Sequence, residues 1–109
     1  MTASLWSDTS LPVFATPPPA EADVLVIGAG ITGLTCAIEL TRDGRRVTVI
    51  DDGPIGGGET GRTSAHLASA VDDRYYELES KFGKEGARLV AESHGAAIDY
   101  IVKLVTERR

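Results

Sequence analysis

The chain has 109 residues, a hydrophobic fraction of 42% and a formal net charge of −5 at pH 7. This length allows one small domain at most, and the apolar content is that of a globular chain rather than a disordered one. The acidic balance provides no basic face for nucleic acid, and no apolar stretch approaches the roughly 20 residues that a membrane span requires.

Residues 1–22 form a proline-rich tail. The run Pro17-Pro18-Pro19 favours an extended polyproline conformation, because proline cannot donate a backbone hydrogen bond. The tail is either a disordered leader or an arm that docks across another part of the molecule. Its apolar residues, Trp6 above all, with Val13 and Phe14, favour the arm.

Residues 23–51 indicate a nucleotide-binding unit. The apolar run Val24-Leu25-Val26-Ile27 predicts a strand, and Gly28-Ala29-Gly30-Ile31-Thr32-Gly33 follows it directly. A helical stretch then leads to a second strand, Val47-Thr48-Val49-Ile50, which Asp51 follows. This order of strand, glycine turn, helix, strand and acid is typical of a Rossmann-like βαβ unit in an α/β fold.

Each element of this unit has a physical role in binding a dinucleotide. Gly28 makes the tight turn, Gly30 lets the backbone approach a pyrophosphate, and Gly33 lets the helix lie close to the strand. The helix N-terminus offers N–H groups to the phosphates. Asp51, 18 residues after Gly33, can accept hydrogen bonds from a ribose and would repel a 2′-phosphate, which favours FAD or NAD(H) over NADP(H). The alternative is a purely structural glycine turn.

The first helix is predicted over residues 31–42, with Asp43-Gly44 as its stop signal. Gly33, Cys36, Ala37 and Leu40 are expected to share the face that packs on the strands. The single cysteine, Cys36, is therefore interpreted as a small buried residue. One cysteine and the lack of a secretory signal favour a cytoplasmic protein.

Residues 52–63 are predicted to be a loop that contains five glycines. Glycines there would let backbone N–H groups approach a ligand, and the alternative is a flexible surface loop. Beyond Ser64 the chain is predicted to be helical. Tyr75, Leu78 and Phe82 mark one piece that Gly83 ends. A second helix carries an apolar stripe formed by Ala87, Val90, Ala91, His94, Ala97, Ile98, Ile101, Leu104 and Val105.

The two histidines lie outside the nucleotide-binding unit. His94 is interpreted as a hydrogen-bonded core histidine rather than a site residue. His66 follows the glycine-rich loop, and its proximity to a cofactor, even as a covalent attachment point, is the minor alternative. Two strands that are apolar on both faces belong in the middle of a covered parallel sheet, and no third strand of similar quality follows. We therefore expect this chain to be the N-terminal part of a larger protein.

The chain resembles the N-terminus of FAD-dependent oxidoreductases of the D-amino-acid oxidase/glycine oxidase superfamily. It is most similar to the branch whose members often carry a Rieske iron–sulfur domain. The helical part from Tyr75 to Ile101 is also similar. The stretches that carry the resemblance are Ser4-Leu5-Trp6-Ser7-Asp8-Thr9, residues 22–35 and Ile55-Gly56-Gly57-Gly58-Glu59-Thr60-Gly61-Arg62-Thr63-Ser64-Ala65-His66.

The resemblance implies that residues 23–109 are the N-terminal part of a FAD/NAD(P)-binding domain in an enzyme acting on amine- or amino-acid-like substrates. Asp52 stands where family members usually have a basic residue. No residue here is nominated as catalytic or metal-binding. The cofactor-binding set is predicted to be Gly28, Gly30, Ile31, Thr32, Gly33, Asp51, Asp52, Gly58, Thr60, Gly61, Arg62, Thr63 and Ser64.

Three hypotheses remain open from the sequence. The chain is the FAD-binding portion of an oxidoreductase, an NAD(H)-binding module without a flavin, or a fragment that holds no cofactor on its own. The glycine-rich loop after Asp51 favours the first over the second. Its expected partners are a small-molecule substrate and the remainder of the flavoenzyme, with neither nucleic acid nor a membrane.

Overall fold

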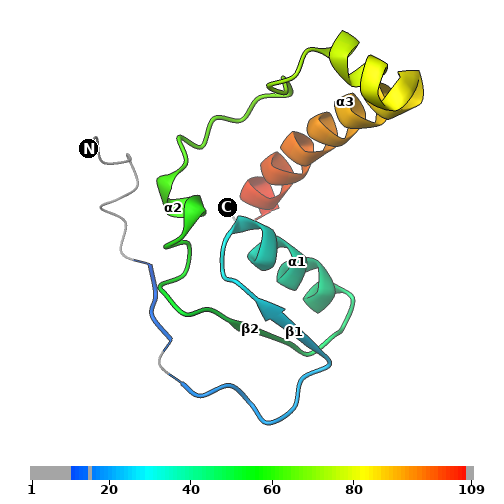
Figure 1. The fold of residues 1–109 in the computed structure, drawn as a ribbon. Helices are drawn as coiled ribbons and strands as arrows, with labels where there is room; N and C mark the ends of the chain where they lie inside the picture. The colour runs from blue at the N-terminus through cyan, green and yellow to red at the C-terminus, as the bar shows by residue number, and fades with distance from the viewer. Residues whose placement is uncertain (1–10, 15, 108–109) are drawn as a thin grey trace. The chain divides into compact units, whose positions relative to one another are not determined.

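The computed structural model describes residues 11–14 and 16–107, and the chain forms two compact units, Met1–Ser64 and Ala65–Arg109. The first unit contains β1 (Val24–Ile27), α1 (Ile31–Arg42), β2 (Val47–Ile50) and α2 (Glu59–Arg62). The second contains α3 (Tyr75–Glu107) (Figure 1). Trp6, whose hydrophobic side chain favoured a docking arm, lies outside the described residues.

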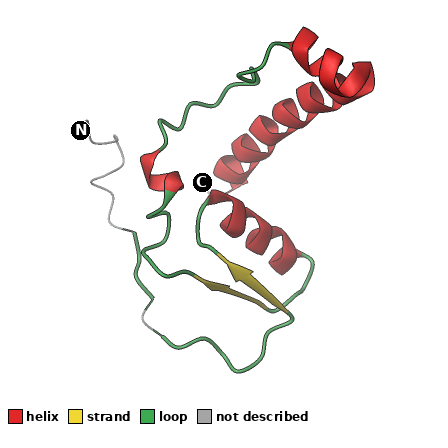
Figure 2. Cartoon of the chain, in the orientation of Figure 1, coloured by secondary structure: helices red, strands yellow, loops and turns green. Residues whose placement is uncertain are grey.

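The strands β1 and β2 form a parallel pair in which Val24 lies opposite Val47 and Ile27 opposite Ile50 (Figure 2). Both strands and α1 have the bounds predicted from the sequence. At the amino ends of the two strands, Asp23 Oδ1 lies 2.9 Å from Arg46 Nη2. The backbone N–H of Arg46 also donates to Asp23 Oδ2 at 2.9 Å. These bonds fix the register where the two strands begin, and the Arg46 side chain lowers the pKa of Asp23.

Helix α1 packs on one face of this pair. A Cβ added at Gly33 would collide with the carbonyl oxygen of Gly28 and lie 3.2 Å from Val26 Cγ1. Glycine at position 33 is therefore what allows the helix to lie so close to β1, as the sequence predicted. On the opposite face, Leu25 is 55% and Ile27 is 79% exposed. Within the described residues the sheet has two strands, so only one of its apolar faces is covered.

The prediction for Cys36 was wrong, because its side chain is exposed. Ala37 is buried and Leu40 is half-buried, so these residues form the packed face with Gly33. Cys36 lies about 60° from Gly33 around the helix axis on the side away from Ala37, at the edge of that face. The helix ends as predicted, since Asp43 is its C-cap and Gly44 adopts a φ of +80°.

The loop after Asp51 is more ordered than its composition predicted. Residues 59–62 form α2, a single helical turn. The Gly56 N–H donates to the Ala29 carbonyl at 2.9 Å, which ties this loop to the turn after β1. A Cβ on Gly61 would lie 2.6 Å from the Gly56 carbonyl oxygen, so the glycine at 61 has a packing role inside the loop.

The second unit contains α3, preceded by the non-helical residues 65–74, and α3 is bent at Gly83, where φ is 72° and ψ is 172°. This confirms that Gly83 ends the first helical piece. The predicted apolar stripe is mostly half-exposed, because only Leu78 and Ala87 are buried in α3. His94 is half-buried, and its Nδ1 lies 2.9 Å from the Val90 carbonyl oxygen, while His66 is exposed. None of the described helices is long and apolar enough to cross a membrane.

Candidate functional site: a glycine turn, a helix N-terminus and a carboxylate

The turn between β1 and α1 is built on Gly28. Its φ of +106° is a conformation that L side chains rarely adopt, and its N–H donates to the Ile50 carbonyl at 2.8 Å. The next residue, Ala29, is only 3% exposed. The chain therefore reverses direction tightly and begins α1 directly beside the end of β2, as the sequence predicted for Gly28.

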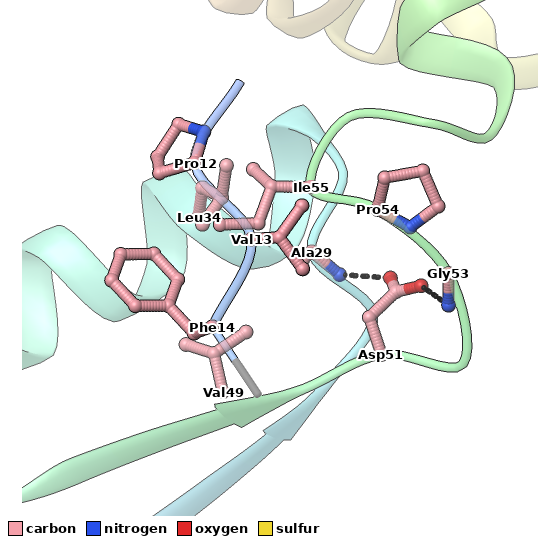
Figure 3. Close-up of a pocket in the computed structure, with 10 residues that line it drawn as sticks. All are labelled: Pro12, Val13, Phe14, Ala29, Leu34, Val49, Asp51, Gly53, Pro54 and Ile55. Carbon is pink, nitrogen blue, oxygen red and sulfur yellow. Dashed lines mark hydrogen bonds between the residues drawn. The ribbon is translucent and has the colours of Figure 1, made fainter. Parts of the chain in front are cut away.

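Asp51, the first residue after β2, faces this turn. Its Oδ2 accepts the Ala29 N–H at 2.6 Å, and its Oδ1 accepts the Gly53 N–H at 2.8 Å (Figure 3). These hydrogen bonds lower the pKa of Asp51 below its usual range. The bond from the Ala29 N–H has the largest effect, and the bond from the Gly53 N–H has the next largest. A carboxylate offers roughly four acceptor positions. Asp51 can therefore hold both N–H groups and still accept a hydrogen bond from a ligand hydroxyl.

The N-terminus of α1 presents hydrogen-bond donors. Gly30 is its N-cap and provides no side-chain cap, and the first turn contains no acidic residue. The N–H groups of Thr32 and Gly33 consequently have no partner within the helix. The Ile31 N–H donates to Thr60 Oγ1 at 2.9 Å. This hydroxyl oxygen occupies the kind of position that a phosphate oxygen takes at a helix N-terminus.

The first turn of α1 has the type of donors that bind a pyrophosphate, such as that of FAD. A Cβ added at Gly30 would meet Thr60 Oγ1 at 3.1 Å and, apart from its neighbours in the chain, no other heavy atom of the described residues within 4 Å. The backbone there is extended, with φ −82° and ψ −178°, so the main chain itself does not require glycine. The absence of a side chain instead keeps a Cβ away from the first-turn N–H groups of α1, of which that of Ile31 donates to Thr60 Oγ1. This donor set suits an anion placed beside a carboxylate.

The other predicted site residues divide into two groups. The first group lies at the turn: Asp52 follows Asp51 in the chain, Thr32 follows Ile31, and the Thr60 hydroxyl accepts the Ile31 N–H. The second group lies on or next to α2. Arg62 pairs instead with Glu59 at 3.0 Å on the exposed side of α2. Thr63 is the C-cap of α2, Gly58 is its N-cap, and Ser64 ends the first unit. The structure thus gathers Gly28, Gly30, Ile31, Gly33, Asp51 and Thr60 around the turn.

The sequence did not predict one wall of the site. A pocket of about 130 Å³ adjoins Asp51 and Ala29 (Figure 3). Its lining comprises Pro12, Val13, Phe14, Ala29, Leu34, Val49, Asp51, Gly53, Pro54 and Ile55. Three of these residues come from the N-terminal tail. The apolar pair Val13-Phe14 in a proline-rich tail was the available signal, and it did not indicate where the tail docks.

The bonds of Asp51 predict a local pH effect. Because its folded-state pKa is lowered, its ionised form stabilises the first unit above the usual carboxyl pKa of about 3.9. That contribution is lost as the pH falls through the lower, folded-state pKa. In an NMR titration we expect the amide resonances of Ala29 and Gly53 to shift together with a midpoint below about 3.9. Asp51→Asn should abolish the shift, whereas Asp72→Asn should leave it unchanged.

Unaltered Ala29 and Gly53 titrations in Asp51→Asn would contradict the observed bonding. The asparagine amide can accept one of the two N–H bonds through its oxygen, but its NH₂ group would face the other donor. The variant therefore also leaves one N–H without a good acceptor at every pH.

The chain that forms this site is similar to known proteins. The family described as FAD dependent oxidoreductase, abbreviated DAO, matches residues 23–105. The "Putative Rieske 2Fe-2S iron-sulfur protein YhfW" of Bacillus subtilis (strain 168) is 41% identical over 104 residues, which cover 94% of this chain and 20% of that relative. No solved structure matches the chain.

Two further relatives are also similar over a minor part of their lengths. The "Probable oxidoreductase OrdL" of Rhizobium meliloti (strain 1021) is 32% identical over 106 residues, or 94% of this chain and 25% of that relative. The "Gamma-glutamylputrescine oxidoreductase" of Escherichia coli (strain K12) is 34% identical over 68 residues, or 62% of this chain and 16% of that relative. The chain thus spans about a quarter or less of the length of these curated relatives.

Proposed function

Because the chain belongs to the DAO family of FAD-dependent oxidoreductases, we propose that its first unit binds the ADP half of FAD within a larger flavoenzyme. The family match confirms the resemblance identified in the sequence and the choice of FAD as the cofactor. The remainder of the enzyme would supply the further strands, the flavin surroundings and the substrate site. In the proposed enzyme, residues 1–22 form an N-terminal tail and residues 23–109 form the first part of the FAD-binding domain.

The donor set around Gly30 is the observation that carries this proposal. The first-turn N–H groups of α1 would donate to the pyrophosphate, and the bare Gly30 backbone would let it approach. Asp51 would accept hydrogen bonds from the adenosine ribose while it holds the Ala29 N–H. Thr60 would exchange its bond with the Ile31 N–H for one with a phosphate oxygen. The roles of Asp52, Gly58 and residues 61–64 stay predictions that follow from the family resemblance.

The proposed substrate is an amine or an amino-acid-like compound. The Escherichia coli relative is named for gamma-glutamylputrescine, an amine, and this name supports the substrate class. Bound FAD supplies the hydride-accepting chemistry. The residues of this chain would hold and orient the adenosine end, at a distance from the reacting carbon. For that reason we assign no catalytic residue to them.

FAD titration of the 109-residue chain tests the proposal. We expect weak, saturable binding in flavin fluorescence anisotropy, and a colourless protein after gel filtration, because the chain provides only part of the cofactor's surroundings. ADP should compete with FAD, whereas FMN, which lacks the adenosine half, should not. Asp51→Ala should weaken ADP binding about tenfold or more, since a hydrogen bond to a charged group is stronger than one between neutral groups.

Each alternative has its own outcome in this titration. Tighter binding of NAD⁺ than of FAD would favour an NAD(H)-binding module. No saturable binding of FAD or ADP would support the fragment that holds no cofactor and would refute the proposed function for this chain. Stoichiometric FAD that survives gel filtration would contradict the expectation of weak binding.

A further inference from the structure

We propose that residues 11–14, called the arm from here on, form one wall of the adenosine site and that Phe14 positions the adenine base. This inference rests on the proposed function, because it assigns a new segment to the same cofactor site. The arm lies outside the βαβ unit, which begins near Asp23. It nevertheless contributes Pro12, Val13 and Phe14 to the pocket that contains Asp51 (Figure 3).

The arm is seated on the part of the loop that is bonded to the glycine turn. Leu11 Cδ1 lies 3.3 Å from where a Cβ on Gly56 would be, and Gly56 itself is buried. The Gly56 N–H donates in turn to the Ala29 carbonyl at 2.9 Å. The arm, the loop and the turn therefore belong to one contiguous packing arrangement within the first unit.

The chemistry of the pocket suits a nucleoside rather than a phosphate. The described residues of its lining are apolar except for Asp51 and backbone groups, and they include no lysine or arginine. Its volume of about 130 Å³ is well below the roughly 300–1,000 Å³ of pockets that hold a whole drug-sized ligand. It can accommodate one part of a dinucleotide, with the ribose hydroxyls against the Asp51 carboxylate and the phosphates outside, toward the N-terminus of α1.

Phe14 is suited to contact a base. Among the described residues of the lining it is the only aromatic one, and it is 72% exposed, while its neighbour Val13 is 78% exposed. In Figure 3, Phe14 and Asp51 lie on opposite sides of the pocket, with Val13 between them. A ribose held by Asp51 would thus direct its base across Val13 toward Phe14. Base–aromatic stacking would bury apolar surface that the arm now exposes to water.

Calorimetric titration of the 109-residue chain with ADP tests the arm. Phe14→Ala should weaken ADP binding roughly tenfold, the effect of losing one base–aromatic stack. Phe14→Tyr keeps the ring and should restore the affinity of the unaltered chain. Phe82→Ala, which removes an exposed phenylalanine of α3, is the matched control and should leave ADP binding unchanged. Any weak response to FMN should be the same in all four proteins.

The remaining outcomes separate this inference from the function on which it rests. Unchanged ADP affinity in Phe14→Ala, with binding still weakened in Asp51→Ala, would overturn the role of the arm and leave the proposed function intact. Tighter ADP binding in Phe14→Ala would also overturn it, because the arm would then be a plug that the nucleotide displaces. An unaltered chain that binds neither ADP nor FAD would refute the proposed function, and the inference with it.

Discussion

Gly33→Ala is expected to destabilise the first unit by about 2 kcal/mol or more, which is the upper part of the cost of inserting a methyl group into a packed interface. The added Cβ would collide with the Gly28 carbonyl oxygen, which is backbone and cannot rotate away, and would press on Val26 Cγ1 at 3.2 Å. Helix α1 would have to move off β1. Because the unit has no large, fully buried side chain among its described residues, little other packing would resist its unfolding.

Gly95→Ala is the matched control for this substitution. Both glycines lie inside helices, but among the described residues no atom beyond the helix's own nearby backbone lies within 4 Å of a Cβ built on Gly95. Alanine there should stabilise α3 by about 0.5–1 kcal/mol, because it is a much better helix former than glycine. Urea unfolding followed by far-UV circular dichroism, together with hydrogen exchange of the α1 amides, measures both effects. Equal stability changes in the two variants would contradict the close contact between α1 and β1.

The sequence predicted those parts of the fold whose signals are local. Both strands and α1 have the predicted bounds, because an apolar run, a glycine turn and the Asp43-Gly44 stop are each read within a few neighbouring residues. Gly83 was identified for the same reason. Cys36 was wrongly predicted to be buried. Helical periodicity predicts which side of α1 packs on the strands, but it does not predict how far around the helix the buried surface extends. Helix α2 was missed because five nearby glycines predict a loop, whereas its single turn depends on contacts with the turn after β1.

The candidate site was predictable where sheet topology controls it. The carboxyl ends of parallel strands meet at one edge, so Asp51 had to lie close to the turn that follows β1. The sequence could not predict which group Asp51 binds, which is the N–H of the buried Ala29. It also could not place residues 12–14 beside Leu34, Val49 and Ile55, since contacts over such separations have no local pattern.

Gly30→Ala is expected to weaken the binding of ADP and FAD by roughly tenfold to a hundredfold while the fold is kept. A methyl group at this position would stand where the pyrophosphate has to approach the N-terminus of α1. The charge-assisted bonds that would be lost contribute about 1.5–3 kcal/mol each. The fold should tolerate the change, because the backbone is extended. Among the described residues, the only atom that the added Cβ would newly approach is Thr60 Oγ1 at 3.1 Å, on a side chain that can rotate. Alanine is a poorer N-cap than glycine, which limits the loss of stability to about 1 kcal/mol.

The pair Gly30→Ala and Gly33→Ala separates binding from folding within a single helix turn. Parallel ADP titrations and urea unfolding curves should show that Gly30→Ala loses affinity while its stability falls by no more than about 1 kcal/mol. Gly33→Ala should instead lose stability, and should lose affinity only as the first unit unfolds. If Gly30→Ala bound ADP as well as the unaltered chain does, the nucleotide would not approach the backbone at residue 30. The ligand site would then have to lie away from the N-terminus of α1, and Asp51 would serve only to close the turn through the Ala29 N–H.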